Sequence, residues 1–219
     1  MEFKTLHCVW TGIRPLLMHN GLLADPTNKF TRRIKEICSK GSKKMTDADH
    51  EERNRLEWEG GLYWNDNAPA WKNGMGPVIP SDNIERCIQL GAQKSRLGKD
   101  VAAAVFCSVP EVQIKFRKPA GGVTRDGMYA DPGFLLRKGV SVNKARIIRV
   151  RPMIPNPWQL SFDLEYDDSI INEKSLSKAM TDAGQLIGLG DWRPKFGRFL
   201  TTWHEWKGFE PSEAELSEV

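Results

Sequence analysis

The sequence lacks the features that mark several large classes of protein. No apolar run approaches the roughly 18 residues that a membrane-spanning helix needs, and no basic segment followed by an apolar one opens the chain. The cysteines are widely spaced, with no C-x-x-C pair: Cys8, Cys38, Cys87 and Cys107. This spacing favours reduced thiols over a disulfide framework or a zinc site. We therefore expect a cytoplasmic protein with no membrane partner, no metal and no cofactor.

Acidic residues are scarce relative to basic ones outside the last part of the chain. Residues 209–219 hold four glutamates and no lysine or arginine, although the whole chain has a net charge of only +4. The remaining residues therefore carry 32 cations and 24 anions, a net charge of +8. Such an excess suits a polyanionic partner where the cations cluster. We expect one domain over residues 1–208 and an acidic disordered tail over residues 209–219.

Hydrophobic periodicity predicts the elements of an α+β domain. Alternation predicts strands near 2–12, 112–117, 142–152, 158–166 and 198–206, and helical spacing predicts helices near 81–91 and 173–187. The strand at 158–166 alternates most cleanly, and we expect it to pair antiparallel with the strand before it. The core order β-α-β-β-α-β is that of a ferredoxin-like or RRM-like fold, with two helices on one face of a sheet.

Two insertions interrupt this core. Residues 20–77 combine a charged helical part, in which Thr46 and Asp49 resemble a capping box, with a hairpin whose strands are expected at 61–64 and 68–71. Residues 118–142 are rich in glycine and arginine, and we expect them to form a projecting, mobile basic loop.

Cations gather along the second half of the chain. The candidate nucleic-acid-binding side chains lie in a turn, on two strands and in the loop insertion: Lys94, Arg96, Lys99, Arg117, Arg125, Arg137, Lys138, Lys144, Arg146, Arg149 and Arg151. Arg149 and Arg151 share one face of their strand. Alternatively, either arginine pairs with Asp163 across the sheet and leaves less charge for a partner.

A glycine-rich loop follows the last predicted helix. Gly188, Gly190 and Gly197 allow positive φ angles and close backbone approach, while Arg193, Lys195 and Arg198 add charge. Together they predict a loop whose backbone amides and cations bind phosphate groups. The alternative is a helix C-cap followed by a tight turn, with nothing bound.

This helix and its Gly188-x-Gly190-(six residues)-Gly197 loop resemble the glycine-rich signature of the RAMP superfamily. The superfamily includes the CRISPR backbone and crRNA-processing proteins, and Val78-Ile79-Pro80-Ser81 is similar to its first-helix start. The segments 15–20 and 190–194 also resemble a group of uncharacterised phage and prophage proteins. The resemblance implies a protein that binds single-stranded RNA or DNA and forms homo-oligomers, as a filament or a ring, along the strand. Asp191 and Pro194 depart from the signature, in which glycine and small residues are common.

The sequence offers no convincing catalytic group. His19 and Asp25 are candidates for a metal-independent ribonuclease, but neither has a partner at a suitable spacing. Another alternative is a protein-interaction module that uses the tryptophans of the first insertion, Trp58, Trp64 and Trp71. We expect a binding protein and no enzyme.

Overall fold

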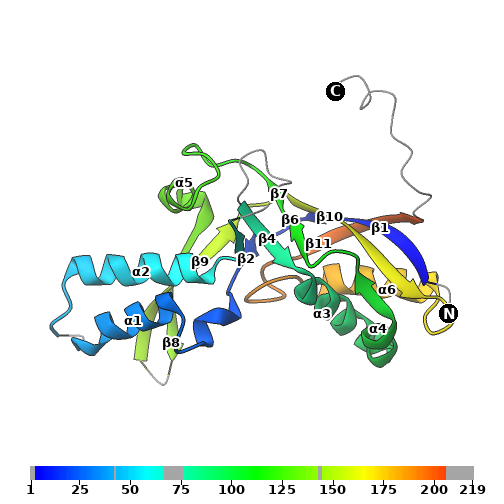
Figure 1. The fold of residues 1–219 in the computed structure, drawn as a ribbon, viewed down its shortest axis with the longest axis horizontal. Coiled ribbons are helices and arrows are strands. Elements are labelled where there is room, and N and C mark those ends of the chain that lie inside the picture. The colour runs from blue at the N-terminus through cyan, green and yellow to red at the C-terminus, as the bar shows by residue number, and fades with distance from the viewer. Residues whose placement is uncertain (1–2, 42, 67–75, 143–144, 206–219) are drawn as a thin grey trace.

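The computed structural model describes residues 3–41, 43–66, 76–142 and 145–205, and within them it has an α+β architecture of helices and antiparallel sheets (Figure 1). Lys144 and the expected acidic tail lie outside these residues, as does the expected strand at 68–71. None of the helices in the described part of the chain has the length and apolar character needed to cross a membrane.

A central antiparallel sheet organises the molecule. Its strand order is β11-β1-β10-β5, and β7 pairs with another part of β10. The strands are β1 (Phe3–Gly12), β5 (Val105–Cys107), β7 (Lys115–Phe116), β10 (Trp158–Asp167) and β11 (Phe199–Glu205). The strand predicted at 158–166 is confirmed, but its predicted pairing is wrong. β10 pairs with β1, β5 and β7, because residues 145–154 belong to a different sheet.

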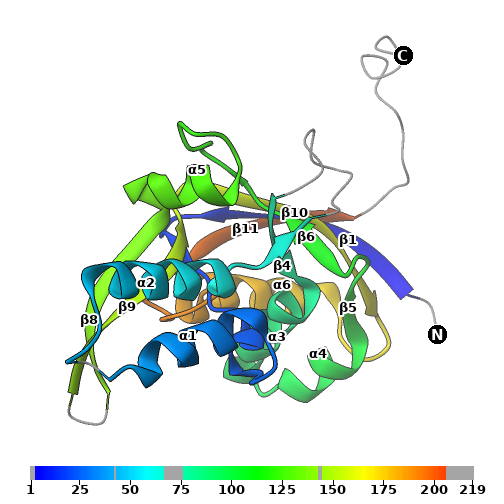
Figure 2. The same ribbon diagram turned by 60° about the vertical axis from the view of Figure 1, so that its left-hand side comes forward.

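The alternation of β1 places its apolar side chains on one face of this sheet. Leu6, Cys8 and Trp10 are buried, and the Cys8 thiol contacts Met180 of a helix. The Trp10 ring stacks on Phe199 with centroids 4.0 Å apart. Figure 2 shows helices α3 (Ser81–Ala92) and α6 (Glu173–Asp182) together on this face. Ser81 is the first residue of α3, and the N-cap position is held by Pro80.

Short elements complete the core around α3. They are β3 (Trp64–Asn65), β4 (Gly76–Pro80), the turn η2 (Gln93–Ser95), α4 (Gly98–Ala104), β6 (Glu111–Gln113) and, after α6, the π-helical turn η4 (Ala183–Ile187). The single strand predicted at 112–117 is in fact β6 and β7, which pair with β4 and β10 respectively. The fourth position of the central sheet, next to β10, is held by β5, with Cys107 opposite Leu164.

The first insertion is a pair of helices packed on each other. It contains the turn η1 (Gly21–Ala24), α1 (Lys29–Ser39) and α2 (Asp47–Gly61). The predicted capping box is confirmed, because the Thr46 hydroxyl accepts from the Asp49 amide while the Asp49 carboxylate accepts from the Thr46 amide. The strand expected at 61–64 is only the short β3, and it pairs with β4 rather than with a strand at 68–71 in the described residues.

The second insertion is not the loop that its glycines indicate. It folds into α5 (Arg125–Ala130), the turn η3 (Pro132–Phe134) and β8 (Leu135–Val142). β8 pairs along its whole length with β9 (Ala145–Ile154), and β2 (Leu16–Leu17) pairs with the far end of β9. The backbone hydrogen bonds to β9 hold residues 135–142 as a strand, although the composition of 118–142 predicts a loop. Figure 1 shows this hairpin beside α1 and α2, away from the central sheet.

Candidate nucleic-acid interface

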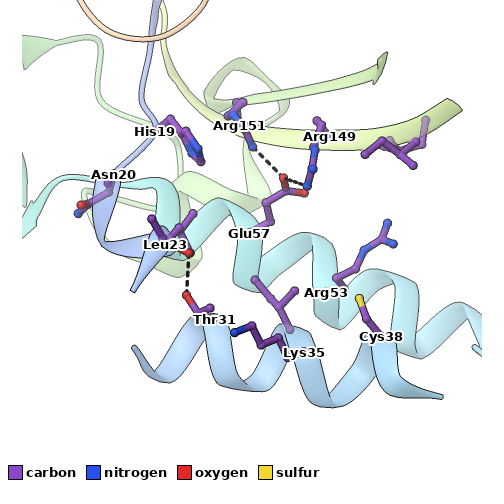
Figure 3. A pocket seen from close by; sticks show the side chains of 15 residues that line it. His19, Asn20, Leu23, Thr31, Lys35, Cys38, Arg53, Glu57, Arg149 and Arg151 are labelled. Carbon is purple, nitrogen blue, oxygen red and sulfur yellow. Dashed lines mark hydrogen bonds and ion pairs between the residues drawn. The ribbon is translucent and has the colours of Figure 1, made fainter. Parts of the chain in front are cut away.

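A cleft of about 540 Å³ lies between the helical insertion and β9 (Figure 3). Its walls come from η1, α1, α2 and β9, so it is built from segments more than one hundred residues apart in the sequence. Its apolar part includes Leu23, Ala24, Ile34, Ile147 and Ile148. Such a concave site with an apolar wall and a few charged groups is the usual form of a ligand site.

Glu57 is the centre of an ion-pair network in this cleft. Its carboxylate accepts hydrogen bonds from Arg149 Nη1 at 3.1 Å and from Arg151 Nη1 at 2.8 Å. Arg151 also donates from Nε to Asp191 Oδ2 at 3.1 Å, and only 8% of its surface is exposed. The prediction that Arg149 and Arg151 share a face is therefore confirmed. Their alternative pairing with Asp163 is wrong, because β9 does not lie beside β10.

Cations outnumber anions on the wall of the cleft. Lys35, Arg53, Arg149 and Arg151 line it, against the single carboxylate of Glu57. Arg53 and Glu57 are four residues apart on α2, which places them on one face of the helix. Figure 3 shows Lys35 on α1 across from α2. Within the described residues no ion pair involves Lys35 or Arg53, and sequence reasoning missed both cations.

His19 joins this cleft to a second, smaller cavity of about 120 Å³. The smaller cavity is also lined by Tyr63, Asn83, Asp191 and Arg193. Partial burial, followed by the charge of Arg151, lowers the pKa of the His19 imidazole below its usual range. The ring is therefore neutral at neutral pH, and it keeps both a donor and an acceptor nitrogen.

The glycine loop packs against the start of the chain. Gly188, Gly190 and Gly197 all have positive φ angles, as expected. A side chain at Gly190 would collide with the Leu17 carbonyl, and one at Gly197 would collide with the Leu189 carbonyl. The glycines thus allow backbone to approach backbone inside the protein.

The amides of this loop are used within the protein. The amides of Leu189, Asp191 and Gly197 donate to the carbonyls of Gly197, Leu17 and Pro15, each at 2.8 Å. Gly188 is the C-cap residue of η4. These contacts occupy the amides of Leu189, Asp191 and Gly197 inside the protein, and they agree with the C-cap alternative for Gly188.

The side chains of the loop, in contrast, face other basic segments. Arg193 and Lys195 are exposed, and Arg193 lines the smaller cavity. Lys138 of β8 lies with its Nζ 5.6 Å from the centroid of the Trp192 ring. Arg198 is half-buried, and its Nε atom has no hydrogen-bond partner among the described residues. The loop therefore extends the basic surface from the cleft through Trp192 and Arg193.

Six other predicted cations do not line the cleft. Three of them form ion pairs with the insertions: Arg117 with Asp131 of the second insertion, and Arg125 and Arg137 with Asp66 and Glu51 of the first. Lys94, Arg96 and Lys99 are exposed around η2, between α3 and α4. Arg146 lies on β9, near the turn of the hairpin. The structure thus brings together only part of the predicted set.

The tryptophans of the first insertion have different environments. Trp58 is fully buried, and its Nε1 donates to the Phe134 carbonyl at 2.9 Å. Trp64 is half-buried beneath the Arg125 guanidinium, and Trp71 lies outside the described residues. Trp58 is thus occupied in the core rather than available to a partner protein.

A scan against protein-family models matched no family, and a search of curated proteins found no matching relative. In the described part of the chain, no three histidine, cysteine, aspartate or glutamate side chains are grouped to hold a metal ion.

Proposed function

We propose that this protein binds single-stranded nucleic acid, RNA or DNA, in the cleft between the helical insertion and β9. The observation that carries the proposal is the charge of the cleft, where four cations from three elements face one carboxylate. A strand whose phosphates replace small counterions on such a surface gains affinity that depends steeply on salt. Trp192 and the apolar wall of the cleft add surfaces on which unpaired bases can pack.

The cations divide into two roles. Arg151 is buried between Glu57 and Asp191, so it fixes the glycine loop against α2 and has little contact with solvent. Lys35 and Arg53 have no carboxylate partner in the described residues, and they contact the phosphates together with Arg149. Lys138, Arg193 and Lys195 continue this surface on β8 and on the loop.

The proposed role of the cleft is binding without catalysis. The acidic groups around His19, Glu57 and Asp191, are both engaged by arginines. A histidine that acts as a general base is oriented by a further group, and neither of these carboxylates is free to orient His19.

We further propose a ferredoxin-like core of the RAMP type, and homo-oligomers that assemble along the bound strand. The strand order β11-β1-β10-β5, with α3 and α6 on one face, supports the fold. The β8–β9 hairpin projects from the core, as a clamp on a strand or on a neighbouring copy would. The free cysteines, two of them buried, support a cytoplasmic location.

Fluorescence anisotropy with labelled, mixed-sequence single strands of RNA and DNA tests the proposal at two salt concentrations. We expect micromolar or tighter binding at low salt. In the double variant Lys35→Ala/Arg53→Ala the slope of log K against log salt should become shallower by about 1.4, because each phosphate contact contributes about 0.7 to its magnitude. Absence of micromolar binding at low salt to either strand would overturn the proposal.

The matched control is the double variant Lys174→Ala/Lys178→Ala. It removes the same charge from exposed positions on α6, outside the cleft. A salt slope that falls equally in both double variants would assign the binding to overall charge and not to the cleft.

A further inference from the structure

We infer a second site, a hydrolytic one, on the face of the central sheet opposite α3 and α6, where Ser161 is a nucleophile, His7 its general base and Asp163 the residue that orients His7. The substrate class is a carboxylic ester with an unhindered carbonyl. The site is separate from the cleft, and the inference does not depend on nucleic-acid binding.

The distances between the three side chains carry the inference. His7 Nδ1 lies 2.6 Å from Asp163 Oδ1, and the Ser161 hydroxyl oxygen lies 3.1 Å from His7 Nε2. The two ring nitrogens thus contact a carboxylate on one side and a hydroxyl on the other. A Ser-His-Asp triad is recognised by this geometry and not by the order of its residues in the sequence.

The sheet register explains why these residues meet. His7 is opposite Asp163 and Val9 is opposite Ser161 in the antiparallel pairing of β1 with β10. Residues two apart on one strand point to the same face, so Ser161 and Asp163 both flank the His7 ring. Leu6, Cys8 and Trp10 are buried beneath the helices, which places His7 on the opposite face. A rigid central sheet therefore holds the array.

The hydrogen bonds set the chemical roles. The ionised Asp163 carboxylate accepts the proton on Nδ1, which leaves the lone pair of Nε2 directed at the Ser161 hydroxyl. The side chains of His7 and Asp163 keep 24% and 32% of their surface exposed, so a substrate can reach them. Ser161 is likewise half-buried rather than fully buried.

A second imidazole lies beside the array. His204 of β11 is opposite His7 in the register, and the two ring centroids are 5.1 Å apart. His204 is exposed, and its ring N–H is the donor we assign to the oxygen that becomes negative during the reaction. His204 is thus a positioned donor, and its loss lowers the rate less than the loss of Ser161.

The reaction is balanced without any further reagent. The Ser161 oxygen forms a bond to the ester carbonyl carbon while its proton moves to His7 Nε2. The tetrahedral intermediate then breaks its bond to the alkoxide, which takes that proton and leaves as an alcohol. Water attacks the acyl-Ser161 in the same way, with His7 again as base, and releases the acid and the free serine.

Two measurements on the full chain test the inference. The first is labelling by a fluorophosphonate, in which the Ser161 oxygen displaces fluoride from phosphorus, followed by mass spectrometry of the peptide that contains Ser161. The second is hydrolysis of p-nitrophenyl acetate. We expect label on Ser161 and, since a positioned base contributes about 100-fold or more, a loss of at least about ten-fold in kcat/KM for Ser161→Ala and for Asp163→Asn.

Ser177→Ala is the matched control, because the Ser177 hydroxyl donates to the backbone carbonyl of Glu173 on α6 and pairs with no histidine in the described residues. It should keep the wild-type rate and leave the labelling of Ser161 unchanged. An unlabelled Ser161, or a Ser161→Ala variant that hydrolyses the ester at the wild-type rate, would overturn the inference. The latter result would assign any hydrolysis to a histidine acting alone.

Discussion

The central sheet and the cleft are held together by different forces. In the sheet, Trp10 lies between Phe199 and Phe162, with ring centroids 4.0 Å and 5.1 Å away, and all three are buried. In the cleft, Glu57 and Arg151 are also buried, and they form an ion pair with each other. Apolar packing needs only shape and volume, whereas a buried charge needs a specific partner at hydrogen-bond distance.

This difference decides how each region responds to substitution. A smaller apolar side chain in the sheet leaves a cavity, whose cost depends on volume. Loss of one charge in the cleft leaves its partner buried without an opposite charge, and the resulting loss of stability depends on charge rather than on volume. Four variants compare the contributions of apolar packing and of charge to stability, from the largest expected effect to the smallest.

Trp10→Ala should lower the free energy of unfolding by about 4 kcal/mol, because it removes the ring between Phe162 and Phe199. Urea denaturation followed by circular dichroism measures the change. Trp10→Phe keeps most of the packing and should cost clearly less. A loss below about 1 kcal/mol for the alanine variant would show that the ring stack is not a main source of core stability.

Glu57→Ala should lower the free energy of unfolding by about 3 kcal/mol, because Arg151 then remains buried with Asp191 as its only carboxylate in the described residues. Glu57→Gln has nearly the same volume and retains an acceptor for the arginines. If charge rather than volume decides, this variant should still lose stability. Equal stability of Glu57→Gln and wild type in urea would remove the distinction between the two regions.

Asp49→Asn should have a smaller effect that depends on pH. The Lys40 ammonium and the Thr46 amide lower the pKa of the Asp49 carboxyl to about 2 from its ordinary value of 3.8. The folded state therefore favours the ionised form, and the stability gained above pH 4 is lost as the pH falls through the folded-state pKa.

Thermal unfolding of wild type and Asp49→Asn at several pH values measures this effect. The wild type should be more stable at pH 5, and the difference should shrink as the pH falls towards about 2. A difference that stays constant between these pH values would show that Asp49 acts through its shape alone.

Lys178→Ala should change the free energy of unfolding by less than about 0.5 kcal/mol. Lys178 pairs with Asp182 one turn along α6, and 60% of its side chain is exposed. Urea denaturation beside Glu57→Ala compares an exposed ion pair with a buried one. A loss as large as that of Glu57→Ala would contradict the assignment of stability to burial.

The sequence predicts where regular elements lie better than it predicts which strands pair with each other. The alternation of β10 and the capping box at Thr46 are local patterns, and the structure confirms both. The partner of β9 could not be read in this way, because alternation identifies the faces of a strand but not the strand beside it. β8 was missed because Gly139 and its adjacent cations interrupt the apolar pattern.

The candidate sites were harder to predict because they join distant residues. Arg151 was a candidate from its strand, but its partner Glu57 lies 94 residues away, and no local pattern links them. His7 and Asp163 are 156 residues apart and meet only through the register of β1 with β10. The glycine loop was recognised, yet its close backbone contacts are with Leu17 and Pro15, near the start of the chain.

The helical insertion begins and ends at one place on the core. The Asn20 amide donates to the Gly61 carbonyl at 3.0 Å, and the Asn20 side chain donates to the Leu62 carbonyl at 3.1 Å. The two ends of the segment from η1 through α2 therefore lie side by side and are joined by hydrogen bonds. Because Asn20 and Leu62 lie side by side, the forty-one residues between them add Trp58 to the core and Glu57 to the cleft without separating the strands on either side.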